Sequence, residues 1–409
     1  METDDLRRHL ETHLSQHLPL LEDWVGINTH TENADGVNEL ARRTADAFAR
    51  LGFEAETSPS AHPWAGRHLF LTARGTTNRT IVLVSHLDTV FRREEEQKYD
   101  FRFRAESDKL YGPGVADIKG GTLMALMTLD ALRAVCPAEF NAITWRVGLN
   151  ALEEKLDDEF NRLLRERLAG PVLAVLVFEA GADWEGCWPL VVARKGRVEF
   201  RIDVEGRGAH AGAEYWKGRN AIVDACRIAP RLEQISDRTK DLTVNVGRML
   251  GGTEVNCVPQ EALILGEIRA FREEYVRQGW ESVQQIVDDF NRDLRSAGAR
   301  ATATLTERLP PWSRNEATER LFSLWEAVGA ALGLVGPVVR QERGGLSDGN
   351  LFWHDHPTLD GLGPTGANTH QSKRSDDGSE EQEFVRVSSF VPKALLNCRA
   401  MLSLIRSSS

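Results

Sequence analysis

The sequence lacks the features of several protein classes. Its 409 residues contain no run of about 18 apolar residues, the length of a membrane-spanning helix. The first residues, METDDLRRHLETHL, are charged and lack the apolar core of a signal peptide. We therefore expect a soluble, cytoplasmic protein. The formal net charge is −11 and no lysine or arginine run stands out, so nucleic acid and anionic membranes are poor candidates for partners.

Cysteine is also scarce. The five cysteines are odd in number, scattered along the chain and never arranged as C-x-x-C. This pattern predicts free thiols, and it argues against both a disulfide framework and a thiolate zinc site. The hydrophobic content of 41% and the charged content of 27% are typical of a globular protein. At this length the default expectation is two domains.

Strand-like and helix-like segments alternate in the first half of the chain. Apolar strands are predicted at 67–75, 80–87, 142–150 and 172–178, and the helical pattern at 119–135 falls between two of them. This alternation predicts an α/β fold with a mostly parallel sheet and helices on both faces.

From residue 193 the pattern changes. Four strands with alternating apolar residues surround two long helices, up to a pair of tandem prolines. This composition predicts an inserted α+β unit at 193–310. We expect residues 1–192 and 311–409 to form one discontinuous domain. Within it, the polar stretch QSKRSDDGSEEQE at 371–383 predicts a surface excursion.

Polar residues end several of the predicted strands. In SHLDTV, His86 and Asp88 share one face of a strand, because successive side chains alternate between faces. A doubly wound sheet brings such strand ends to one crevice. The residues expected there are His86, Asp88, Asp117, Glu153, Glu154, Glu179 and His370. Their carboxylates would repel one another unless cations were present.

Two divalent metal ions would balance this charge. Imidazole and carboxylate ligands without thiolates suit zinc, with manganese or cobalt as substitutes. In metal pairs roughly 3.5 to 4 Å apart one carboxylate bridges the ions, and Asp117 is the natural candidate. Of the adjacent Glu153 and Glu154, one would bind metal and the other would take a proton from water as a general base.

The ordered segments SHLDTV, GPGVADIKGG, NALEE, FEAG, RGAHAG, GGTEVNCVP, GGLSDGN and GPTGANTH resemble the dinuclear zinc exopeptidases of the aminoacylase and glutamate carboxypeptidase family, over nearly the whole chain. The resemblance implies that Glu153 is the general base and that Asp88 lies behind the ligands as an outer-shell carboxylate. It also implies a cis peptide bond after Asp117. The implied ligands of two Zn²⁺ per chain are His86, Asp117, Glu154, Glu179 and His370.

The same resemblance implies that the inserted unit is a lid that forms a homodimer. His210 in RGAHAG would polarise the scissile carbonyl. Asn256 and Arg269 would contact a substrate carboxylate, and Gly345 and Ser347 would line the same pocket.

The expected reaction is hydrolysis of an amide bond next to a free carboxylate, in a small peptide or an N-acyl-amino acid. In the family, a glutamate at the position of Glu179 is more frequent in carboxypeptidases and deacylases than in aminopeptidases, so a carboxypeptidase is favoured. An N-acyl-amino-acid deacylase and a non-catalytic metal-containing protein that binds amino acids are the alternatives. Two departures from the family are Leu152, where an aspartate is common, and the longer region after His370.

Overall fold

The chain forms two compact units in a computed structural model that describes residues 1–155, 158–294 and 298–407. The first unit contains both ends of the chain, and the second is inserted between its parts. The first comprises Met1–Val192, Arg314–Glu342 and Ser347–Ser409; the second comprises Ala193–Ser313 and Arg343–Leu346.

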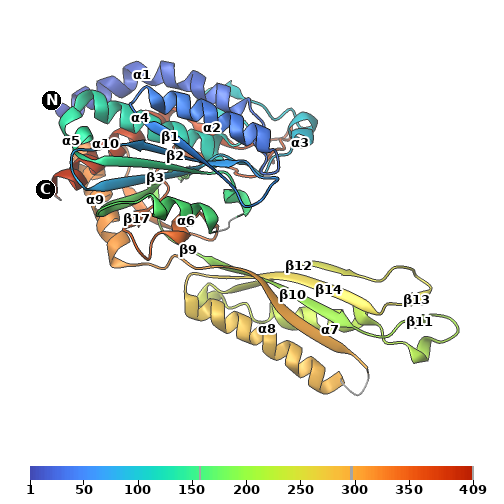
Figure 1. Ribbon diagram of the computed structural model, residues 1–409. Coiled ribbons are helices and arrows are strands. Elements are labelled where there is room, and N and C mark those ends of the chain that lie inside the picture. Colours follow the sequence, from blue (N-terminus) through green and yellow to red (C-terminus); the bar gives the residue numbers. More distant parts are fainter. Residues whose placement is uncertain (156–157, 295–297, 408–409) are drawn as a thin grey trace. The chain divides into compact units, whose positions relative to one another are not determined.

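A six-stranded sheet forms the centre of the first unit (Figure 1). Its strands lie in the order β1 (Glu54–Pro59), β2 (Arg67–Ala73), β6 (Thr144–Asn150), β3 (Thr80–His86), β7 (Val172–Val177) and β17 (Thr358–Leu359). The strands from β6 to β17 pair in parallel, whereas β1 and β2 form antiparallel pairs at one side. The carboxyl ends of β6, β3 and β7 therefore lie next to one another.

Alternating side chains of this sheet face two separate cores. Leu69 and Ile81 pack in the core that includes the helices above the sheet in Figure 1, whereas Phe70 and Val82 pack against α6 (Glu159–Glu166) on the other face. The helices of the first face are α1 (Glu2–Val25), α2 (Ala34–Ala49), α4 (Gly120–Val135) and α10 (Phe390–Ser407). The predicted α/β class with helices on both faces is confirmed.

Shorter elements complete the first unit. Short strands form a second sheet in the order β4 (Arg104–Glu106), β5 (Lys109–Tyr111), β19 (Phe384–Arg386), β18 (Thr365–Ala367) and β8 (Gly181–Ala182). The remaining helices are α3 (Arg93–Lys98), α5 (Pro137–Ala142) and α9 (Glu316–Leu332). Strands β9 (Trp188–Arg194) and β16 (Val338–Arg343) pair with each other.

The predicted surface excursion at 371–383 is wrong at its two ends. Ser372, Gln382 and Glu383 are buried, with at most 2% of the surface of each exposed. Gln382 donates from Nε2 to the carbonyl oxygens of Ser372 (2.8 Å) and Tyr99 (3.1 Å). These contacts draw the ends of the stretch into the first unit, so only its middle is a polar surface loop.

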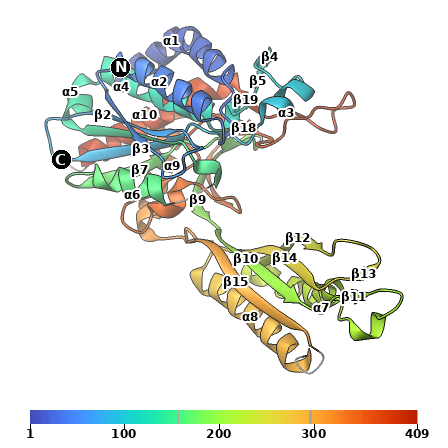
Figure 2. The same ribbon diagram turned by 45° about the vertical axis from the view of Figure 1, so that its right-hand side comes forward.

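The second unit is an antiparallel sheet with two helices on one face. The strands lie in the order β12 (Thr243–Gly251), β14 (Glu261–Ala270), β10 (Gly196–Glu205) and β15 (Arg300–Leu309). Apolar side chains of β10 such as Phe200 and Ile202 pack with α7 (Ala221–Glu233) and α8 (Glu273–Leu294). The short strands β11 (Ala209–His210) and β13 (Cys257–Val258) form a separate pair, drawn at one end of this unit in Figure 2.

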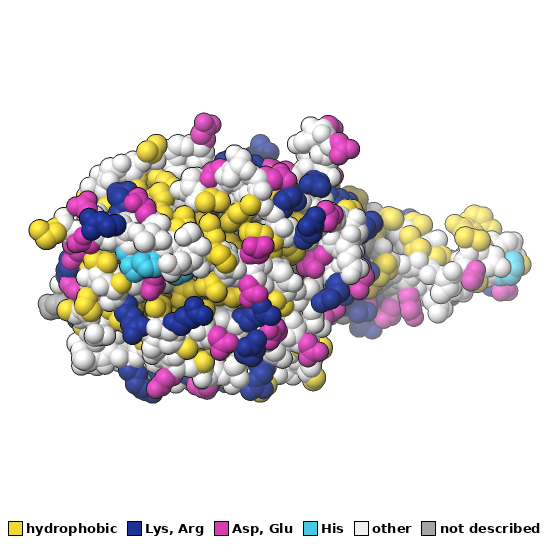
Figure 3. Space-filling model, turned by 90° about the horizontal axis from the view of Figure 1, so that it is seen from above, with side chains coloured by type: hydrophobic (Ala, Val, Ile, Leu, Met, Phe, Trp, Pro, Cys, Tyr) yellow, Lys and Arg dark blue, Asp and Glu magenta, His cyan; other side chains and the backbone are white. Residues whose placement is uncertain are grey.

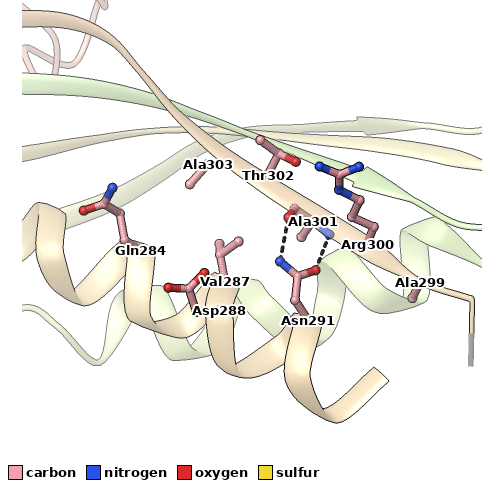
Figure 4. A pocket seen from close by; sticks show the side chains of 9 residues that line it. All are labelled: Gln284, Val287, Asp288, Asn291, Ala299, Arg300, Ala301, Thr302 and Ala303. Carbon is pink, nitrogen blue, oxygen red and sulfur yellow. Dashed lines mark hydrogen bonds between the residues drawn. The ribbon is translucent and has the colours of Figure 1, made fainter. Parts of the chain in front are cut away.

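Helix α8 also forms hydrogen bonds to β15, the strand at one edge of this sheet. Asn291 donates from Nδ2 to the carbonyl oxygen of Ala301 (2.8 Å) and accepts from the Ala301 N–H (2.7 Å), as Figure 4 shows. The hollow between α8 and β15 has a volume of about 610 Å³ and is also lined by Gln284, Asp288 and Thr302. Because the amide of Asn291 mimics a neighbouring strand, it satisfies backbone groups that an edge strand leaves unpaired.

The outer surface carries mixed charge on the face that α1 and α2 cover. Figure 3 shows lysine and arginine side chains interspersed with aspartate and glutamate on that face. Among the described residues, no helix combines the length and the apolar character that crossing a membrane requires.

Candidate metal centre

The ends of three parallel strands carry the candidate ligands. His86 is the last residue of β3, Glu153 and Glu154 begin a short turn after β6, and Glu179 follows β7. Asp117 belongs to an irregular turn, Val115–Lys119, that leads into α4. The peptide bond between Asp117 and Ile118 is cis, as the resemblance implied. The alternation of strands and helices thus brings residues from distant parts of the sequence to one end of the sheet.

Asp117 joins two groups of potential ligands. His86, Asp117 and Glu179 form one group, and Asp117, Glu154 and His370 form the other; within each group, the candidate ligand atoms lie within 4.8 Å of one another. Oδ1 of Asp117 is 2.9 Å from Nε2 of His86, and Oδ2 is 3.2 Å from Nε2 of His370. Each oxygen of Asp117 therefore faces a different histidine, which is the arrangement of a bridging carboxylate.

The other distances complete the two groups. Oε1 of Glu179 is 3.8 Å from Nε2 of His86, and Oε2 of Glu154 is 3.3 Å from Nε2 of His370. The donors are imidazole nitrogens and carboxylate oxygens without a thiolate, a set that suits zinc, manganese or cobalt. The residues therefore fit a pair of divalent cations.

Strong mutual interactions shift the pKa values of these groups. Burial would raise the pKa of Asp117, but hydrogen bonds from His370 and His86 hold it well below its usual value. Hydrogen bonds to Asp117 and Glu154 raise the pKa of His370 to about 11. Burial and the charge of Asp117 raise the pKa of Glu154 to about 7. Without a metal, the cluster thus keeps protons on groups that would have to give them up to act as ligands.

Glu153 lies beside the two groups. Its Oε2 is 4.0 Å from Nε2 of His86. Burial, together with the charges of Glu179 and Glu154, raises the pKa of Glu153 well above its usual value. A carboxyl group that holds a proton near neutral pH is suited to accept and release protons during a reaction.

Asp88 fixes the turn that carries the two adjacent glutamates. Its Oδ1 accepts from the Glu153 N–H (3.0 Å), and its Oδ2 accepts from the Glu154 N–H (3.2 Å) and the Thr31 hydroxyl (2.8 Å). The backbone oxygen of Asp88 lies 3.0 Å from Nδ1 of His86. Because a carbonyl oxygen can only accept, Nδ1 carries a proton and donates, which leaves Nε2 as the candidate ligand atom.

Two buried acids of this region were not predicted. Asp348 accepts from Nδ2 of Asn150 (3.0 Å) and of Asn161 (3.2 Å), and burial raises its pKa to about 7. Glu383 accepts through Oε1 from the backbone N–H groups of Ala116 and Asp117, and burial and the charge of Asp117 raise its pKa to about 8. Asp348 belongs to GGLSDGN, so that segment offered a signal, whereas Glu383 ends a stretch that resembles a surface loop.

The residues predicted to bind substrate belong mostly to the second unit. His210 and Asn256 are exposed there, and Nδ1 of His210 accepts from the N–H groups of Gly212 and Ala213 at 3.1 Å each. Because Nδ1 is an acceptor in this arrangement, a neutral His210 carries its proton on Nε2 and can donate from it.

Arg269 and Gly345 already have partners within the second unit. Nε and Nη2 of Arg269 donate to the carboxylate of Glu267 at 2.9 and 3.0 Å. The carbonyl oxygen of Gly345 accepts from Nη1 of Arg194 (3.0 Å). The guanidinium of Arg269 thus already binds a carboxylate of the same chain, that of Glu267, through two of its nitrogen atoms.

Ser347, which was predicted to line the substrate pocket, has its hydrogen-bond partners within the first unit. The side chain is fully buried, its hydroxyl donates to Oδ2 of Asp360 (2.9 Å), and it accepts from the Gly349 N–H (3.1 Å). The hydroxyl therefore caps the short turn Asp348–Leu351.

Known proteins resemble both units. Residues 192–295 match the family model of the M20 peptidase dimerisation domain. The chain is 26% identical to carboxypeptidase G2 of Pseudomonas sp. (strain RS-16) over 390 residues, which is 94% of this chain and 88% of that protein. An aminopeptidase from Bacillus cereus has a similar fold, with a TM-score of 0.73, 20% identity and coverage of 96% and 99% of the two chains.

The solved structure of a dinuclear metal-binding peptidase of the M20 family from Bacillus subtilis also has a fold similar to that of this chain. The TM-score is 0.69, the identity is 15%, and the match covers 97% of this chain and 99% of that one. The chain is thus similar to carboxypeptidase G2 over most of its length and to the M20 dimerisation domain in its second unit. These similarities confirm the predicted resemblance to zinc exopeptidases and indicate a hydrolytic enzyme. The alternative of a non-catalytic binding protein is therefore set aside.

Proposed function

We propose that this protein is a carboxypeptidase-type hydrolase that holds two zinc ions and cleaves an amide bond next to a free carboxylate. The single observation that carries this proposal is the pair of ligand groups that share Asp117, with Glu153 beside them. Similarity to carboxypeptidase G2 over 94% of the chain supports the substrate class. The glutamate at position 179 agrees with it.

The chemistry divides between the cations and the side chains. Two divalent cations bound here would polarise the scissile carbonyl and lower the pKa of a water molecule. The five ligands are His86, Asp117, Glu154, Glu179 and His370. Glu153 takes the proton of the attacking water and passes it to the leaving nitrogen. Asp88 holds Glu153 and Glu154 in register through their backbone N–H groups.

The second unit supplies a hydrogen-bond donor and an interface in this proposal. His210 donates from Nε2 to the carbonyl oxygen as negative charge develops on it, which its exposed position and the acceptor role of Nδ1 support. Asn256 and Arg269 contact the substrate carboxylate, for which Arg269 must exchange its bond to Glu267. The chain forms a homodimer through this unit, because residues 192–295 match a dimerisation domain. Light scattering after gel filtration tests the dimer.

A substrate panel tests the reaction. The zinc-loaded protein is incubated with dipeptides, N-acyl-glutamates and the same compounds with an amidated C-terminus. We expect hydrolysis only where the carboxylate is free, and Glu153→Gln serves as the inactive control. Faster cleavage of N-acyl-amino acids than of peptides would instead indicate a deacylase. Equal cleavage of the amidated compounds would contradict carboxylate recognition.

A further inference from the structure

We propose that Glu383 is a positioning residue for the metal centre: it holds the backbone that presents Asp117 and the segment that presents His370. This inference rests on the proposed function in one respect, namely that Asp117 and His370 are metal ligands. Glu383 itself contributes no ligand atom to either group of candidate ligands.

The side chain of Glu383 accepts hydrogen bonds from the backbone at Asp117. Its Oε1 accepts from the N–H groups of Ala116 (2.8 Å) and Asp117 (3.1 Å). The backbone angles at Asp117 (φ −117°, ψ 78°) depart from those of a helix. Helical hydrogen bonding therefore does not set the direction of this side chain. Two successive N–H groups bound to one oxygen fix the peptide plane from which the Asp117 side chain projects.

The backbone of Glu383 reaches the neighbour of a second candidate ligand. Its N–H donates to the carbonyl oxygen of Gln371 (2.9 Å), which directly follows His370. The next residue, Phe384, pairs with Tyr111 in β5 and so anchors Glu383 in a sheet. Glu383 thus links the chain segment that carries Asp117 to the segment that carries His370. In the folded chain, Nε2 of His370 lies 3.2 Å from Oδ2 of Asp117.

A purely structural role explains Glu383 poorly. The residue is 0% exposed, and its second oxygen, Oε2, has no hydrogen-bond partner among the described residues. A buried acid oxygen without a partner lowers stability, and an apolar side chain of similar size would fill the space without that cost. The contact of Oε1 with the backbone at Asp117 accounts for an acid, or an amide, at this position.

Metal binding tests the inference without relying on activity. Zn²⁺ affinity is measured by competition with a chromophoric chelator, and the geometry of the site by the visible absorption of the Co²⁺-loaded protein. We expect Glu383→Ala to weaken Zn²⁺ binding by about 10- to 100-fold, as loss of an outer partner of a ligand does, and to alter the Co²⁺ spectrum. Glu383→Gln keeps an acceptor oxygen and should retain both properties.

Glu381→Ala is the matched control. Glu381 lies two residues earlier and accepts from the Tyr111 hydroxyl and Lys109 instead of the backbone at Asp117, so its loss should leave Zn²⁺ binding unchanged. If Glu383→Ala does not fold, Glu383→Asp replaces it, because its shorter side chain loses the contact whereas glutamine keeps it.

Three results would overturn the inference: unchanged Zn²⁺ affinity in Glu383→Ala or Glu383→Asp, equal losses in these variants and in Glu381→Ala, or binding in Glu383→Gln as weak as in Glu383→Ala. Failure of the proposed function gives a different result, because the wild-type protein would then bind no Zn²⁺ at all.

Discussion

Metal binding should release protons from this protein. In the metal-free state, hydrogen bonds to carboxylates raise the pKa of His370 to about 11, and the same kind of contact outweighs the effect of burial and raises the pKa of His86 well above its usual value. Both imidazoles therefore carry a proton on Nε2 at pH 7. Because a metal needs the lone pair of that nitrogen, loading two cations must displace roughly two protons from the histidines.

The neighbouring acids add to this number. The pKa of Glu154 is raised to about 7 and that of Glu153 well above its usual value, mainly by burial. Both ionise once cations balance the charge, so we expect roughly two to four protons released per chain at pH 7. At pH values below the raised pKa of the histidines, the affinity for the metal ion should increase about tenfold per pH unit for each proton that the cation displaces.

Calorimetry in buffers of different ionisation enthalpy measures this release directly. The observed binding enthalpy should vary with the buffer enthalpy, with a slope equal to the number of protons released. His370→Asn should reduce that number by about one, because it removes one of the two charged imidazoles. Release of less than one proton per chain, or affinity that does not change between pH 6 and 8, would refute the charge distribution described above.

Other substitutions test the catalytic and structural assignments. Glu153→Gln should lower turnover by about 10²- to 10⁴-fold with unchanged zinc content, measured by elemental analysis and substrate hydrolysis. Asp130→Asn should lower the free energy of unfolding at pH 7 by about 1.5 kcal/mol, measured by denaturant unfolding. Burial raises the pKa of Asp130, but hydrogen bonds from two histidines of α1 outweigh this effect and lower the pKa. That stability is present above the unfolded pKa of about 4 and is lost as the pH falls through the lower folded pKa. In Gly121→Ala the added Cβ would lie 1.9 Å from the carbonyl oxygen of Phe178, so we expect a loss of about 3 kcal/mol, whereas Gly344→Ala, with no atom within 4 Å, should unfold like the wild type.

Three of the candidate ligands could be predicted because they lie at the carboxyl ends of neighbouring parallel strands. His86 ends β3, Glu154 follows β6 and Glu179 follows β7, and these strands are neighbours in the sheet. Parallel strands with crossover helices bring such ends together regardless of their separation along the chain. The local pattern therefore contains the information for this part of the centre.

The supporting contacts could not be predicted in the same way. Glu383 contacts the backbone of Asp117 only because the chain returns after residue 371 and adds β19 to β5, and no local pattern encodes that return. The partner of Arg269 was foreseeable, since Glu267 is two residues away on the same face of a strand.

Anomalous diffraction from crystals of the zinc-loaded protein tests the central claim most directly. The claim predicts two peaks roughly 3.5 to 4 Å apart, with Asp117 between them, His86 and Glu179 at one, and Glu154 and His370 at the other. A single peak, or two peaks that Asp117 does not bridge, would contradict it.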